Sequence, residues 1–91
     1  MLFVALLKAH PGTIQESSDR RVEWEYPEGT QVVAEYWLQT LDPAVISVCE
    51  ADHISQLWTL FAGWNDNFDI TIVPAITAEE GLELLKQMMQ D

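Results

Sequence analysis

The stretch DHISQLWTLFAGWNDNFDITIVP, residues 52–74, decides the fold of this chain. In its first half apolar residues return every three or four positions, the spacing of one helix face, and Asp52 is placed to cap that helix. In its second half apolar and polar residues alternate, which is typical of a half-buried strand. An Asn-Asp-Asn cluster between the halves favours a turn. We therefore predict a helix over residues 53–64 and a strand over residues 68–74.

Upstream of this stretch, residues 2–9 form an apolar run of strand length that ends at a Pro-Gly turn. Residues 13–26 are more highly charged, and their spacing predicts a weakly amphipathic helix that ends before Pro27. β-Branched and aromatic residues then predict two strands, over residues 30–40 and 44–51, which a short turn joins as a hairpin.

The inner face of the helix over residues 13–26 follows from its four-residue spacing. Ile14, Ser18, Val22 and Tyr26 recur at this interval. Because residues four positions apart lie on the same side of a helix, we expect Val22 and Tyr26 to face the core.

Downstream, the last fifteen residues predict a terminal helix. Thr77 and Glu80 have the T-x-x-E spacing of a capping box. Leu82, Leu85 and Met89 then form one apolar stripe.

The complete order of elements is β, α, β, β, α, β with a helix appended. Since crossover connections are right-handed, few arrangements satisfy this order. We predict one α+β domain over residues 1–91 with the ferredoxin-like split βαββαβ fold. Its four-stranded antiparallel sheet carries both crossover helices on one face.

The composition excludes several classes of partner. The chain has 91 residues, and fifteen acidic residues against four basic ones give a net charge of −11. Such a charge repels phosphate backbones and anionic lipids, so we expect neither nucleic acid nor membrane as a partner. Cys49 is the single cysteine, and with His10 and His53 it forms no metal-ligand spacing. We expect no metal or cofactor, and a cytoplasmic location.

Alternation along the strands assigns the two faces of the sheet. We expect the face toward the helices to carry Phe3, Ala5, Leu7, Ala9, Val32, Ala34, Tyr36, Leu38, Ala44, Ile46, Val48, Phe68, Ile70 and Ile72. The opposite face remains too apolar for plain solvent exposure, because it includes Leu2, Val4, Leu6, Val33, Trp37, Val45 and Val73. We therefore predict a homodimer in which two such faces pack together around a semi-polar cavity.

A family resemblance supports this arrangement. The run Trp24-Glu25-Tyr26-Pro27-Glu28-Gly29 is followed by Glu35-Tyr36-Trp37, Trp64-Asn65-Asp66, Phe68-Asp69-Ile70, Val73-Pro74 and Glu79-Glu80. In order and spacing, this set resembles a family of small uncharacterised bacterial and archaeal proteins in the dimeric α+β-barrel superfamily. The resemblance covers about residues 20–80. It implies a fold and a dimer but no activity, and no catalytic residue of that superfamily maps onto a motif here.

The candidate site residues all belong to the predicted helix-free face. A histidine or a carboxylate beside an aromatic wall is the arrangement that proton abstraction requires. Such residues are more often hydrogen-bonded parts of an interface, and we favour that structural interpretation. The candidates are His10 and Glu35 as catalytic groups, and Lys8, Trp37, Cys49 and Thr71 as ligand-binding groups.

Three hypotheses about function follow. The first is a small-molecule binding protein whose pocket lies between the facing sheets of a homodimer. The second is a cofactor-independent monooxygenase- or isomerase-like enzyme that uses His10 or Glu35 as a base against Trp37. The third is a protein–protein interaction module whose open sheet face binds another chain.

Overall fold

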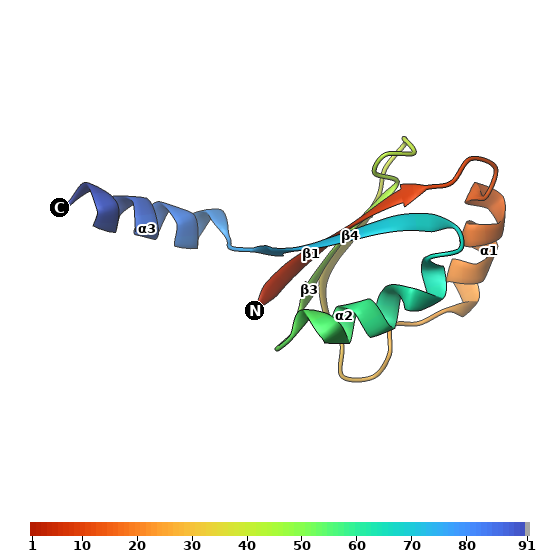
Figure 1. Ribbon diagram of the computed structural model, residues 1–91, viewed down its shortest axis with the longest axis horizontal. Helices are drawn as coiled ribbons and strands as arrows, with labels where there is room; N and C mark the ends of the chain where they lie inside the picture. The colour runs from red at the N-terminus through yellow and green to blue at the C-terminus, as the bar shows by residue number, and fades with distance from the viewer. Residues whose placement is uncertain (91) are drawn as a thin grey trace.

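The computed structural model describes residues 1–90, and its elements follow the predicted order (Figure 1). Two strand–helix–strand units form the body of the molecule, and one further helix follows. The elements are β1 (Leu2–Ala9), α1 (Ile14–Glu23), β2 (Gln31–Trp37), β3 (Val45–Glu50), α2 (Ile54–Phe61), the 3-10 turn η1 (Ala62–Trp64), β4 (Phe68–Ala75) and α3 (Ala78–Met89).

The four strands form one antiparallel sheet in the order β2-β3-β1-β4. β1 pairs with β3 on one side and with β4 on the other, so each crossover helix connects strands that are separated by a third. This is the split βαβ arrangement, and it confirms the ferredoxin-like fold. α1 and α2 lie on the same side of the sheet (Figure 1).

The core lies between the sheet and α2. Leu57, Phe61 and Trp64 are buried there against the side chains that β1 and β4 turn toward the helices. Trp58 is 48% exposed, so only part of the predicted stripe reaches the core. Phe3 and Ile72 are buried on the same side of the sheet, as the alternation along these strands predicts.

The cap of α2 differs by one residue from the prediction. His53, with extended backbone, is the N-cap instead of Asp52. The side chain of Gln56 turns back, and its Oε1 accepts hydrogen bonds from the backbone N–H groups of both Asp52 and His53, at 3.0 and 3.2 Å. The glutamine three residues after the N-cap thus satisfies the backbone amides of the N-cap and of the residue before it.

α1 attaches to the body through polar residues, and the predicted inner face is wrong at Val22 but confirmed at Tyr26, which packs against the core just beyond the end of the helix. Val22 is 83% exposed and Ile14 is 45% exposed, whereas Ser17 is buried. The four-residue spacing misled because the apolar members of the series are few and the helix is short. The side chains of Ser17, Arg20 and Arg21 make the contacts instead.

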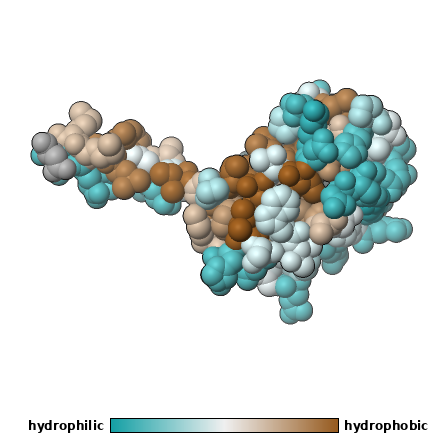
Figure 2. All heavy atoms as spheres, in the orientation of Figure 1, coloured by the Kyte–Doolittle hydropathy of each residue, from teal (hydrophilic) through white to brown (hydrophobic). Residues whose placement is uncertain are grey.

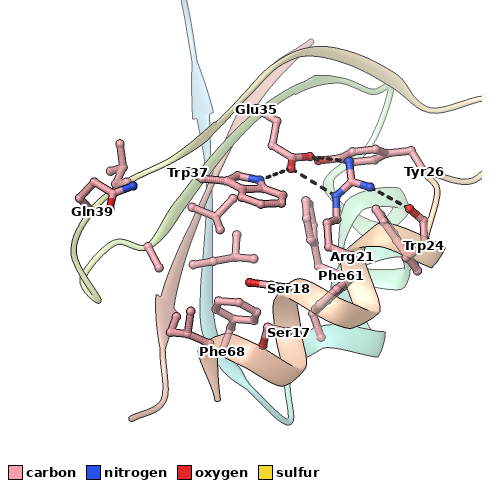
Figure 3. Close-up of a pocket in the computed structure, with 16 residues that line it drawn as sticks. Ser17, Ser18, Arg21, Trp24, Tyr26, Glu35, Trp37, Gln39, Phe61 and Phe68 are labelled. Atoms are coloured by element: carbon pink, nitrogen blue, oxygen red, sulfur yellow. Dashed lines mark hydrogen bonds and ion pairs between the residues drawn. The ribbon is translucent and has the colours of Figure 1, made fainter. Parts of the chain in front are cut away.

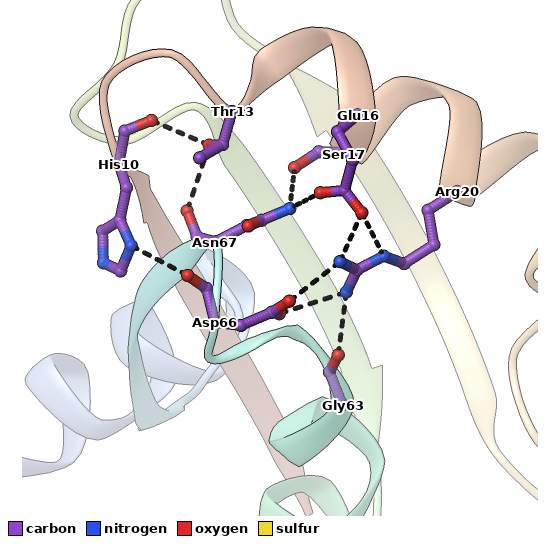
Figure 4. A network of polar contacts seen from close by, with 8 residues as sticks. All are labelled: His10, Thr13, Glu16, Ser17, Arg20, Gly63, Asp66 and Asn67. Carbon is purple, nitrogen blue, oxygen red and sulfur yellow. Dashed lines mark hydrogen bonds and ion pairs between the residues drawn. The ribbon is translucent and has the colours of Figure 1, made fainter.

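A polar network holds the first half of α1 against the loop before β4 (Figure 4). Arg20 donates to both carboxylate oxygens of Asp66, at 3.1 and 2.9 Å, and also to Glu16 and to the carbonyl of Gly63. Its guanidinium lies 5.1 Å from the ring centroid of Trp64, which is cation–π distance. The Asn67 amide donates to Ser17 Oγ at 2.9 Å and to Glu16. These contacts fix the position of α1 above the sheet.

The strand pairing corrects the predicted faces of β3 and of β2 from Ala34 onward, whereas Val32, before a bulge, pairs with Cys49 on the helix-covered face as predicted. Ser47 pairs with Ala5, and Cys49 pairs with Phe3, so both belong to the helix-covered face and both are buried. Glu35 pairs with Ser47 and therefore shares that face. The faces of β1 and β4 are as predicted. Alternation misled because β3 turns its more apolar side, with Ile46 and Val48, away from the helices, whereas Ser47 on the covered side forms a hydrogen bond with Tyr26 Oη.

The helix-free face is consequently more apolar than predicted. Ile46 and Val48 pair with Leu6 and Val4 and face this side, together with Tyr36, which is 59% exposed. Its apolar members are Leu2, Val4, Leu6, Ala34, Tyr36, Ile46, Val48, Val73 and Ala75.

α3 projects from the end of β4 away from the body (Figure 1). Thr77 caps it as predicted, because its Oγ1 accepts a hydrogen bond from the backbone N–H of Glu80 at 3.1 Å. None of residues 78–89 is buried. Figure 2 shows hydrophobic residues along this arm and at the point where it leaves the body. No helix formed by residues 1–90 combines the length and the apolar character needed to cross a membrane.

Candidate functional site

A cleft of about 310 Å³ lies between α1 and the helix-covered face of the sheet (Figure 3). We call it the α1 cleft. Aromatic rings from five different segments form much of its wall, and serine hydroxyls from α1 line it on the helix side. Its lining comprises Leu7, Ile14, Ser17, Ser18, Arg21, Trp24, Tyr26, Glu35, Trp37, Leu38, Gln39, Ala44, Val45, Phe61, Trp64 and Phe68.

The carboxylate of Glu35 organises one side of this cleft. Tyr26 Oη donates to Glu35 Oε1 at 2.6 Å, and Trp37 Nε1 donates to Oε2 at 2.6 Å. Arg21 adds two bonds, from Nε at 3.3 Å and from Nη2 at 3.2 Å. The carboxylate therefore accepts four charge-assisted or neutral hydrogen bonds, which is about its full acceptor capacity.

These contacts set the ionisation of the cluster. Burial raises the pKa of Glu35, but hydrogen bonds from Arg21, Tyr26 and Trp37 outweigh burial, so the pKa of the carboxyl lies below its usual value. Burial and the neighbouring carboxylate raise the pKa of Tyr26. At neutral pH Glu35 is thus ionised and Tyr26 is neutral. The negative charge of Glu35 is compensated by the guanidinium of Arg21.

The segment that follows α1 builds the aromatic wall. Trp24 ends the helix in an extended conformation, and its ring meets the rings of Tyr26 and Trp64 edge to face, with centroids 4.8 and 5.6 Å apart. The guanidinium of Arg21 lies over both Trp24 and Tyr26, at 5.3 and 5.5 Å from their centroids. Arg21 Nη1 also donates to the carbonyl of Trp24 at 2.8 Å. The same arginine therefore links the wall to Glu35.

A second hollow, of about 470 Å³, lies at the other end of β3. Its lining is mostly polar and charged, and Glu50 there pairs with the N-terminal amine of Met1 at 3.1 Å. Large aromatic surfaces provide most of the contact area in small-molecule sites, and this hollow has none. The α1 cleft is therefore the stronger candidate despite its smaller volume.

The family model of DUF3303, a domain of unknown function, matches residues 1–89 of the chain. The chain belongs to the DUF3303 family. This membership confirms the prediction of an uncharacterised family, and it assigns no activity. No curated protein and no solved structure matches the chain.

In this DUF3303 domain, the six candidate residues predicted on one sheet face do not share a face. Glu35 and Trp37 lie together in the α1 cleft, and Cys49 lies on the same face, where it is buried. Lys8 and Thr71 lie on the helix-free face. Lys8 of β1 pairs with Asp69 of β4, and Thr71 of β4 pairs with Leu6 of β1. The prediction of a shared face is wrong for the reason given above, namely the reversed faces of β2 and β3.

His10 lies beyond the end of β1 and does not line the α1 cleft. Its Nε2 is 2.8 Å from Asp69 Oδ1, and its Nδ1 is 3.1 Å from the carbonyl of Asp66. The hydrogen bond to Asp69 raises the pKa of His10. The arrangement is a surface ion pair that connects the end of β1 to β4.

Cys49 is shielded from solvent beneath the cluster. Its Sγ lies 3.4 Å from Ser47 Oγ, and burial raises the pKa of the thiol. A neutral buried thiol is a poor nucleophile. Among the described residues, 1–90, no group of three or more His, Cys, Asp or Glu side chains is placed to hold a metal ion.

Sequence reasoning missed Arg21, Tyr26 and the serines of α1 as site residues. One available signal was the pair Arg20-Arg21, which supplies half of the four basic residues of a strongly acidic chain. Such scarce cations pair with particular carboxylates. The second signal was the proximity of Trp24 and Tyr26 to this pair, within reach of cation–π contact.

Proposed function

We propose that this protein binds a small, uncharged, mainly apolar molecule in the α1 cleft, and that it works as a homodimer. The observation that carries the binding proposal is the cleft itself, in which aromatic rings surround a space of about 310 Å³ beside a fully hydrogen-bonded Glu35. This volume is at the small end of the roughly 300–1,000 Å³ found for ligand pockets.

The charge of the cleft favours a neutral ligand. Arg21 and Glu35 compensate each other, and the carboxylate has little acceptor capacity left for a ligand. Ser18 and Gln39 also line the cleft and offer a hydroxyl and an amide. The chemistry points to a ring system with one hydrogen-bonding substituent, stacked among the aromatic side chains.

Binding is better supported than acid–base catalysis. A general base must accept a proton from its substrate, and its pKa is best placed near the working pH. The oxygens of Glu35 are already occupied by Arg21, Tyr26 and Trp37, and its pKa is lowered. We therefore interpret Glu35 as the residue that positions Trp37 and Tyr26 along the wall.

The dimer proposal follows from the helix-free face. Its nine apolar side chains, Leu2, Val4, Leu6, Ala34, Tyr36, Ile46, Val48, Val73 and Ala75, come from all four strands. Monomeric proteins rarely expose a continuous apolar patch of more than a few hundred Å². A second copy that packs sheet to sheet covers this face, as in the dimeric α+β-barrel superfamily that the sequence resembles. The cavity proposed to bind ligand then belongs to each protomer rather than to the space between the sheets.

The binding proposal is tested with 2-naphthol as the probe, followed by two-dimensional amide NMR. We expect saturable shifts in the signals of α1 and β2, including the indole N–H of Trp37. A Ser18→Phe variant, which fills the cleft, is expected to weaken these shifts at least tenfold. Gln15→Phe is the matched control, because Gln15 is exposed on the same helix and does not line the cleft. Equal binding by both variants, or shifts confined to the helix-free face, would refute the cleft as the site.

A further inference from the structure

Because α3 projects from the body, the molecule is more extended than a compact chain of its length. A compact chain of this length has a radius of gyration of about 12 Å. The observed value is 15.5 Å, and the longest dimension of the molecule is 53 Å. Figure 1 shows that the excess comes from α3, which continues in the direction of β4 beyond the body. The twelve residues of α3 thus form a helix in which no residue is buried against the body of the chain.

The sequence of α3 nevertheless has a well-defined apolar side. Leu82, Leu85 and Met89 fall on one stripe, with Met88 beside it, and all four are more than half exposed. Glu79, Glu83 and Gln87 occupy the opposite side. An isolated helix of about 12 residues is only marginally stable in water, so a helix of this length needs a surface on which to bury its stripe.

That surface is not the body of the same chain. Only Ile76 and Thr77 separate β4 from α3, and the Thr77 cap fixes the direction in which the helix leaves. A membrane is also disfavoured, because the polar side carries three glutamates and a single lysine, whereas membrane-surface helices are rich in Lys and Arg.

The area that a stable dimer requires favours a second copy. Four strands of six to eight residues present a sheet face of only about 450 Å² at the usual rise and strand spacing. Standard stable interfaces bury about 800 Å² on each partner. One side of a 12-residue helix is about 18 Å long and 10 Å wide. In a two-fold pair each protomer both gives and receives such a helix, which raises the contact to about the required area.

We infer that α3 of each protomer docks on the body of a second copy of the chain, as a reciprocal arm that extends the proposed sheet-to-sheet interface. The inference rests on the homodimer proposed above. It adds that the dimer closes only when the stripe of Leu82, Leu85 and Met89 is buried against the partner.

Hydrogen exchange on the unmodified protein tests the inference without any substitution. The amides of α3 are protected when the chain is dimeric, and they lose this protection on dilution in parallel with dissociation, which sedimentation measures on the same samples. Rapid exchange of α3 within an intact dimer overturns the inference. Protection that persists in the monomer overturns it as well, because the helix then has a partner in its own chain.

A pair of variants gives the energetic test. Leu82→Glu/Leu85→Glu places two charges in the stripe, and we expect the dimer dissociation constant to rise at least tenfold. Gln87→Glu/Gln90→Glu adds the same charge on the polar side and is expected to leave the constant within threefold of the wild type. If both pairs dimerise equally well, α3 is not part of the interface while the sheet-face dimer stands. If the unmodified chain is a monomer at every concentration, both proposals fall together.

Discussion

Glu35 is the residue on which the candidate site depends, because it connects three segments of different chemistry. It lies on β2, accepts hydrogen bonds from Arg21 on α1 and from Tyr26 in the following loop, and orients the indole of Trp37. Its side chain is only 16% exposed. A carboxylate in such a position is stabilised by its donors, and each donor is in turn held in place by the carboxylate.

Replacing this carboxylate is expected to destabilise the fold measurably. Glu35→Gln keeps the shape but leaves Arg21 without its counter-charge, and we expect a loss of about 1–3 kcal/mol in the free energy of unfolding. The loss of stability is modest because the side chain of Arg21 is 31% exposed and its charge is partly screened by solvent. Glu25→Gln, at an exposed position in the same region, is the control and is expected to change stability by less than about 0.5 kcal/mol. Urea unfolding measures both, and equal effects would contradict the role assigned to Glu35.

At this scale the sequence identified half of the cluster. Glu35 and Trp37 are correctly paired by their two-residue spacing on one strand. Their partners Arg21 and Tyr26 come from a helix and a loop, and nothing in the local spacing brings these segments to β2. Which partners meet is decided by the packing of α1, which its sequence specifies through ion pairs rather than through an apolar stripe.

At the scale of elements, α1 is unusual because charged groups hold it in place. Arg20 bridges Glu16 and Asp66, and hydrogen bonds from Arg20 lower the pKa of both carboxyls. A carboxyl with a lowered pKa stabilises the fold above its unfolded pKa, and this contribution is lost as the pH falls through the folded value. Acid therefore loosens the attachment of α1.

This attachment predicts a specific titration result. In an NMR titration the carboxyl of Asp66 is expected to have a pKa below its usual 3.8. Arg20→Met removes the charge but keeps the aliphatic stem, and it is expected to return this pKa toward 3.8. Arg21→Met, one residue along the same helix, removes a cation that pairs with Glu35 instead, so it should leave Asp66 unchanged. If the two variants give the same titration of Asp66, the attachment described for α1 is wrong.

Local sequence patterns are enough to predict which elements exist and in what order. They are not enough to predict which side of each strand faces the helices. The residue pattern within 2–9 and within 68–74 is enough to predict strands, and the capping residue Thr77 is enough to predict the start of α3. β3 illustrates the limit, since Val45 and Ile46 are adjacent and equally apolar. Which of them faces the helices depends on the polar surface of α1 across the sheet, and alternation within the strand contains no information about that surface.

At the scale of the whole molecule, one covered face and one uncovered face predict the oligomeric state. Val4 lies in the middle of the helix-free face, between Val48 and Val73. In a monomer a lysine at this position meets water, whereas in a sheet-to-sheet dimer it is buried without a partner, which is strongly unfavourable.

Val4→Lys is therefore expected to raise the dimer dissociation constant at least a hundredfold in sedimentation equilibrium. Val22→Lys is the matched control, because Val22 is 83% exposed on α1, and it should dimerise as the unmodified chain does. Circular dichroism establishes that both variants are folded. A Val4→Lys protein that dimerises normally would exclude the helix-free face as the interface. A monomeric unmodified chain would favour the interaction-module hypothesis, with another protein as the occupant of this face.

Because α1 is attached through polar groups and α2 through apolar ones, ionic strength acts differently on the two helices. Added salt does not weaken the apolar contacts of α2 with the sheet, whereas it weakens the partly exposed ion pairs of Arg20 with Glu16 and Asp66. We therefore expect concentrated salt to weaken the attachment of α1, which roofs the α1 cleft, more than it weakens the packing of α2 on the sheet.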